Sequence, residues 1–225
     1  MNDREGDLWR VVRHVYTMSD TTTAARPRIS TYELTMTAVF TAATCIISPL
    51  SIPIPISPVP LTLGVFITLL SGALLTPKMA FTSQLIRILL GAVGVPVFAG
   101  FQAGFSYLVG PTGGYLIATP FMALVVAFGA KYIRSHSSGK LKTAVIIAAS
   151  CIVAIAVCYL LGTIWFQIVS GRTFAESLML CVVPFIAPDL IKAAFVVIVH
   201  ATVANRIKPF LLHTKRSTLG GDNRI

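Results

Sequence analysis

The chain has 225 residues, of which 55% are hydrophobic and 12% are charged, and its formal net charge is +10. Soluble domains normally have about 25% charged residues, so the composition excludes an ordinary soluble domain and predicts an all-α membrane protein; the alternating pattern of outer-membrane barrels is absent. Most positive residues lie in tails and short loops, so orientation in a membrane explains them better than nucleic-acid binding does.

Three regions are expected along the chain. Residues 1–29 are predicted to be a cytoplasmic extension, because residues 1–28 are polar and charged and contain no apolar core of the length of a signal peptide. Trp9, Val12 and Tyr16 would share one face of a helix at the lipid surface, and a disordered tail is the alternative. A membrane domain over residues 30–207 and a basic cytoplasmic tail over 208–225 follow.

Six apolar segments are predicted to be transmembrane helices. A crossing needs about 20 apolar residues, with a range of about 17–25, and the second and third segments are near the short end. Between these two, the Thr76-Pro-Lys78 turn favours a hairpin over one long broken helix, because proline cannot continue a helix interior. The segments cover residues 34–52, 61–76, 79–96, 115–133, 143–169 and 183–206.

Positive residues predict the orientation of these helices. They occur in both tails, at Lys78 and in the loop over residues 131–142, which all fall on one side if there are six spans. The opposite side has no charge in residues 53–60 or 97–114, and only Arg172 and Glu176 in the fifth connection. We therefore expect six spans with both termini in the cytoplasm, since a five-span chain would put one basic tail outside.

Two connections on the outer side are apolar and rich in proline or glycine. Residues 51–61 alternate proline with apolar residues and cannot be helical. Residues 95–104 lead into Gly110-Pro-Thr-Gly-Gly-Tyr115, whose glycines permit close backbone approach. Irregular backbone at membrane depth is tolerated only inside protein or along a cavity. The connections are therefore predicted to form the lid and wall of a site, with ordinary interhelix turns as the alternative.

An aspartate and a lysine lie inside the last apolar segment. Asp189 and Lys192 are three residues apart and would share a helix face. An ionisable residue within a span costs roughly 3 kcal/mol or more unless it faces a cavity or a partner. Pro188 is expected at the first helical position, which would put Asp189 in the first turn near the outer surface. The pair predicts a ligand site; an internal pair that only neutralises itself is the alternative.

Motifs for enzymatic chemistry are missing. The glycine-rich run lacks the terminal Gly-Lys-Ser/Thr of a phosphate loop, and neither His-Glu-x-x-His nor Gly-x-Ser-x-Gly occurs. The four histidines show no metal spacing. The chain is therefore predicted not to be an enzyme and to have no catalytic residues, metal or cofactor. Four cysteines are interpreted as packing residues: Cys45, Cys151, Cys158 and Cys181.

Residues 30–205 resemble the BioY family, the biotin-binding S components of energy-coupling-factor (ECF) transporters of the bacterial cell membrane. The resemblance rests, in this order, on Pro58-Val-Pro-Leu-Thr62, Gly91-Ala-Val-Gly-Val-Pro-Val-Phe-Ala-Gly100, Gly110-Pro-Thr-Gly-Gly-Tyr115 and Pro188-Asp-Leu-Ile-Lys192. It implies six helices, a biotin site near the outer surface, and dependence on a transmembrane T component with paired ATPases. It also implies that Asp189 and Lys192 belong to the substrate site. Further candidates for this site are Arg87, Phe98, Gly113, Gly114 and Tyr115.

The resemblance has one further consequence, and the chain departs from the family pattern at one position. S components carry a small-xxx-small face on the first helix for the T component, and Ala38-Val-Phe-Thr-Ala42 has that spacing. Arg87, by contrast, departs from the family pattern: members of the family more often have Tyr-x-x-x-Gly where this chain has Arg87-Ile-Leu-Leu-Gly91. An arginine within a span needs a partner. It could reach the ligand carboxylate, pair with Asp189, or contact Gln84 and backbone carbonyls.

Biotin combines a carboxylate on an apolar chain with a ureido ring that has two N–H donors. Asp189 could accept from the ureido group, and Lys192 or Arg87 could pair with the carboxylate; the sequence leaves open which group meets which end. The rival functions are an S component for another vitamin, an intramembrane enzyme acting on lipid, and a structural membrane subunit without a ligand.

Overall fold

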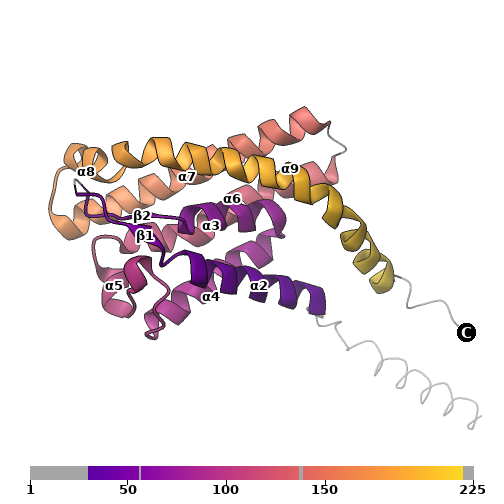
Figure 1. Ribbon diagram of the computed structural model, residues 1–225, viewed down its shortest axis with the longest axis horizontal. Helices are drawn as coiled ribbons and strands as arrows, with labels where there is room; N and C mark the ends of the chain where they lie inside the picture. The colour runs from indigo at the N-terminus through magenta and orange to yellow at the C-terminus, as the bar shows by residue number, and fades with distance from the viewer. Residues whose placement is uncertain (1–29, 56, 137–138, 220–225) are drawn as a thin grey trace, which may run out of the picture. The chain divides into compact units, whose positions relative to one another are not determined.

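The computed structural model describes residues 30–55, 57–136 and 139–219, with side chains described up to residue 203 of the last helix. By its contacts the chain divides into Met1–Leu34 and Thr35–Ile225, and nearly all of the helical fold belongs to the second unit. The elements, drawn in Figure 1, are α2 (Thr31–Ile47), β1 (Ser51–Ile52), β2 (Leu61–Thr62), α3 (Gly64–Leu74), α4 (Pro77–Ala92), the 3₁₀ turn η2 (Ala99–Phe101), α5 (Phe105–Val109), α6 (Gly113–Ser135), α7 (Lys140–Ser170), α8 (Phe174–Cys181) and α9 (Val183–Leu219).

Each of the six predicted apolar segments coincides with a helix, although the bounds differ. Three of the described helices are long and apolar enough to cross a membrane: α6, α7 and the Val183–Val203 part of α9. α2, α3 and α4 are shorter, with 17, 11 and 16 residues. At about 1.5 Å per residue, α3 alone would cover about half of a hydrocarbon core of about 30 Å. The helices support a membrane protein, while the count of six spans and the side of the termini stay predictions.

α3 and α4 form a hairpin, as the sequence predicts. Gln84 on α4 hydrogen-bonds to Thr68 and Ser71 on α3, which requires the two helices to fold back on each other. Pro77 is the first residue of α4, where the missing N–H of proline costs no hydrogen bond. Thr44 on α2 accepts a further hydrogen bond from the Gln84 amide. One buried glutamine therefore ties three helices together.

α6 lies at the centre of the packing and contacts α3, α4 and α7. Gly72 on α3 allows a close approach, because a Cβ there would collide with the backbone carbonyl of Ala123 on α6. Small residues at helix contacts permit such dense packing in membrane proteins. The main core is built from α3, α6, α7 and α9, and its buried members include Leu69, Met122, Val126, Ile147, Cys151, Ala154 and Val196.

The connections between the long helices contain short strands and helices that the sequence analysis does not predict. Residues 51–55 and 57–61 are not helical, as expected, and β1 and β2 lie side by side as a small antiparallel pair. The connection between α4 and α6 contains η2 and α5, and the connection between α7 and α9 contains α8. α8 begins with a capping box formed by Thr173 and Glu176. The hydrogen bond from the Thr173 N–H lowers the pKa of the exposed Glu176 carboxyl from its ordinary value.

The prediction that Pro188 starts the last helix is wrong. α9 begins at Val183, and Pro184 occupies the first turn, where the missing N–H of a proline is tolerated. Pro188 therefore lies inside the helix, and Asp189 lies in its second turn. The helix dipole acts mainly within the first turn, so it does not explain how the Asp189 carboxylate is stabilised.

Candidate functional site

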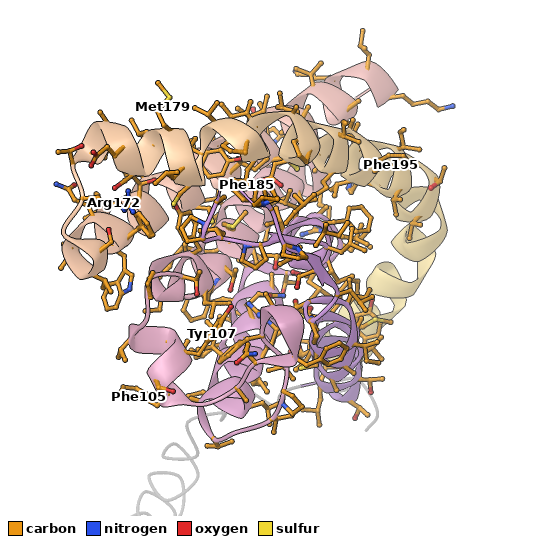
Figure 2. The ribbon with its side chains drawn as sticks, turned by 60° about the vertical axis from the view of Figure 1, so that its left-hand side comes forward. Phe105, Tyr107, Arg172, Met179, Phe185 and Phe195 are labelled. Carbon is orange, nitrogen blue, oxygen red and sulfur yellow. The ribbon has the colours of Figure 1, made fainter. Side chains whose placement is uncertain are left out.

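A cavity opens among α3, α4, α6, α7 and α9. The empty space between its walls is about 810 Å³, the part open to the surroundings included. In Figure 2, Tyr107 of α5 and Phe185 of α9 mark two of the lining residues. The remaining members are Ser48, Val59, Pro60, Thr62, Gly64, Val65, Arg87, Ala99, Thr112, Tyr115, Leu116, Thr119, Met122, Ile155, Cys158, Tyr159, Cys181, Asp189 and Lys192.

Asp189 and Lys192 both line this cavity and form an ion pair. Lys192 Nζ lies 2.8 Å from Asp189 Oδ1, as the three-residue spacing on a helix predicts. The Tyr159 hydroxyl on α7 donates to the other carboxylate oxygen over 2.8 Å. Asp189 is 4% exposed and Lys192 9%. The carboxylate is therefore stabilised by two side chains, and both oxygens retain lone pairs that can accept from a ligand.

Arg87 reaches the same cavity from α4 and is only 2% exposed. Its Nη2 donates to the Thr119 hydroxyl on α6 over 2.9 Å. Among the described residues it forms no ion pair with Asp189. Gln84, the other expected partner, bonds to Thr44, Thr68 and Ser71 instead. Of the three predicted partners, the ligand carboxylate is the one still open.

Tyr115 also lines the cavity, near the start of α6. Its hydroxyl forms a 3.2 Å hydrogen bond with the Thr163 hydroxyl on α7. Its ring lies against Gly162, where a Cβ would collide with the ring atoms. The orientation of the Tyr115 ring is thus fixed by α7 from two sides.

Gly113, Gly114 and Phe98 are not among the lining residues of the cavity. A Cβ on Gly113 would collide with the Leu108 carbonyl, and one on Gly114 would collide with Trp165. Phe98 is fully buried and stacks on Tyr107 with ring centroids 5.4 Å apart. The structure therefore gives these three residues a packing role behind the wall, and their contact with a ligand stays a prediction without a supporting geometry.

Sequence reasoning missed Tyr159 and Thr119, each of which holds one of the ionisable side chains. Both are polar residues inside apolar segments, where a hydroxyl usually finds a partner. A polar residue in an apolar segment does not by itself indicate a contact with another helix, because threonines in these helices also bond to their own backbone, as Thr41 and Thr44 do. Among the described residues, no group of three or more His, Cys, Asp or Glu side chains could hold a metal.

Ala38 and Ala42 lie away from the cavity, on the exposed side of α2. The buried side of this helix carries Thr37, Thr41 and Thr44. The two alanines thus face outward as a docking surface for another helix requires, and the docking itself stays a prediction.

Among known proteins, the sequence model of the BioY family matches residues 18–209 of this chain. The chain is 40% identical to a probable biotin transporter BioY from Pyrococcus horikoshii, over 74% of this chain and 93% of that protein. It is 35% identical to biotin transporter BioY2 from Lactococcus lactis, over 74% and 87%. Its fold is similar to the crystal structure of the S-component for biotin from an ECF-type ABC transporter, with a TM-score of 0.70, 28% identity, and 81% and 95% of the two chains covered.

Proposed function

The chain belongs to the BioY family, and on this basis we infer that it is the S component that captures biotin for uptake across the cell membrane. The relatives that are named biotin transporters and the similar S-component structure support this function. The chain is accordingly a transport protein and not an enzyme. The observation that carries the assignment to a site is the apolar cavity into which Arg87, Asp189 and Lys192 converge.

We propose that this cavity holds biotin. Apolar side chains such as Val65, Met122 and Ile155 line it and suit the hydrocarbon chain of the vitamin. The two ureido N–H groups need acceptors, and the Asp189 carboxylate has lone pairs beyond those used by Lys192 and Tyr159. Lys192 keeps two further N–H donors for the ureido carbonyl or for a ligand carboxylate. The Tyr115 side chain adds a hydroxyl group to the polar groups that line the cavity.

Energy for uptake is proposed to come from other proteins. No phosphate-loop motif occurs in the chain, so a T component with paired ATPases would supply it. We propose that the T component docks on the exposed face of α2 that contains Ala38 and Ala42. Six spans with both termini in the cytoplasm remain our proposed topology, since the basic residues then share one side.

Reconstituted vesicles test this division of labour. The purified chain alone should bind biotin without ATP, and added ATP should cause no accumulation of biotin against its gradient. Co-reconstitution with a T component and its ATPases should produce ATP-dependent accumulation. ATP-driven accumulation by the chain alone, without an ion gradient, would contradict the proposal.

A further inference from the structure

Two buried side-chain polar atoms lack a hydrogen-bond partner within the described part of the chain, and both belong to the wall of the cavity. They are Arg87 Nε and Ser48 Oγ. Buried polar groups are nearly always paired, and an exception needs an explanation, for example a ligand or a water that binds there. That both exceptions lie along one cavity indicates that a polar group of the ligand belongs there.

The charges along the cavity give the sign of this group. The Lys192 cation is matched by the Asp189 carboxylate at 2.8 Å. Arg87 is bonded to a neutral hydroxyl, and no acidic side chain among the described residues forms an ion pair with it. The ionisable lining residues therefore carry one positive charge without a counter-ion. A buried charge is stabilised when it is paired, so a ligand group with a single negative charge would suit this wall.

The guanidinium is held in position before any ligand arrives. The Thr119 hydroxyl donates its own proton to the Leu116 carbonyl and therefore accepts from Arg87 Nη2. One turn earlier on α4, the buried Gln84 fixes the helix against α2 and α3 through its hydrogen bonds. Arginine has five N–H donors in a planar fork that suits a carboxylate. Such a fixed donor group binds a ligand with little loss of side-chain freedom.

We propose that Arg87 is the counter-ion of the carboxylate of biotin, with the Ser48 hydroxyl as an additional polar group on the same wall. This inference rests on the proposed function of the cavity. It also decides the assignment that the sequence leaves open between Arg87 and Lys192. Because Asp189 already neutralises Lys192, the carboxylate belongs to Arg87, and the Asp189–Lys192 pair remains for the opposite end of the ligand.

The test compares biotin with its primary amide, biotinamide, in which the carboxylate is replaced by a neutral group of nearly equal size. Dissociation constants are measured on the purified full chain. The unaltered protein should bind biotinamide about 10- to 150-fold more weakly than biotin, the effect of one charge-assisted hydrogen-bonded contact. Arg87→Met should weaken biotin by a similar factor and leave biotinamide nearly unchanged, so that the preference disappears. Arg87→Lys should retain part of the preference.

Arg172→Met serves as the matched control, because Arg172 is exposed outside the cavity, and this variant should keep the full preference. Equal binding of both ligands by the unaltered protein, or an intact preference in Arg87→Met, would overturn the inference. So would loss of the preference in Lys192→Met instead. If Arg87→Met does not fold, the comparison in the unaltered protein and in Arg87→Lys decides. Binding of neither ligand by the unaltered protein would contradict the proposed function itself.

Discussion

Removing the Asp189–Lys192 pair distinguishes a ligand site from an internal pair. The two groups lie 2.8 Å apart, and both are less than a tenth exposed. If they only neutralise each other, Asp189→Asn or Lys192→Met alone leaves a buried charge unpaired, which costs about 3–5 kcal/mol of stability. The double variant should then be more stable than either single variant, and biotin affinity should change little.

We expect the opposite result for binding. If Asp189 and Lys192 contact biotin, each single variant loses a hydrogen bond to a charged group, worth roughly 1.5–3 kcal/mol or about 10- to 150-fold in affinity. The double variant should not recover this loss, even where its stability recovers. Tyr159→Phe removes one of the two side-chain bonds that hold Asp189, so it should weaken binding less than Asp189→Asn does.

The assay is equilibrium biotin binding to each purified variant, with thermal unfolding measured in parallel. The matched control combines Arg172→Met with Glu176→Gln, which removes one cation and one anion from exposed positions outside the cavity. This control should bind biotin as the unaltered protein does. Unaltered affinity in the Asp189→Asn/Lys192→Met variant would refute the site assignment and leave the pair with a structural role.

Three further predictions concern docking, packing and topology. Ala42→Trp on the exposed face of α2 should reduce co-purification with the T component and reduce uptake, because a bulky residue prevents close helix contact; biotin affinity of the isolated chain should stay the same, and unchanged assembly would exclude this face as the docking surface. Gly162→Val should lower the free energy of unfolding by about 1–3 kcal/mol and weaken biotin binding, because the new side chain overpacks the site and displaces the Tyr115 ring. A variant that unfolds at the same temperature as the unaltered protein and binds biotin equally well would contradict this packing. Cysteines introduced at Lys140 and Arg172, in a background without reactive native thiols, should be labelled by an impermeant reagent from opposite sides of the membrane, with only the second accessible in intact cells; labelling of both from outside would exclude the six-span topology.

The helical framework could be predicted because its causes are local. Apolar runs of helix length determine where α6, α7 and α9 lie, and Pro77 with Lys78 determines the break between α3 and α4. The Asp189–Lys192 contact was equally accessible, since it depends only on a spacing of three residues on one helix.

The contacts between helices could not be predicted in the same way. Tyr159 and Asp189 are thirty residues apart, and Arg87 and Thr119 are thirty-two apart. The glycines near residue 113 were expected to contact a ligand because they permit close approach, and the structure fills that space with Leu108 and Trp165. The glycines thus indicated a close contact, but the sequence did not show whether a ligand or other residues of the protein make that contact.

The start of α9 shows how two local signals compete. Pro184 and Pro188 both suit the first turn of a helix, and the sequence alone offered no reason to prefer the earlier one. The structure begins the helix at Val183, directly after the short α8. α8 itself was missed although Thr173 and Glu176 have the spacing of a capping box, because its eight residues are too few to stand out as an apolar segment.

The proposed function of the chain can be tested by measuring biotin binding to the purified full chain. A titration in detergent, without ATP and with a panel of other vitamins as competitors, measures both affinity and stoichiometry. We predict saturable binding of one biotin per chain, with no displacement by the other vitamins. Absence of biotin binding by the folded protein, or tighter binding of another vitamin, would contradict it.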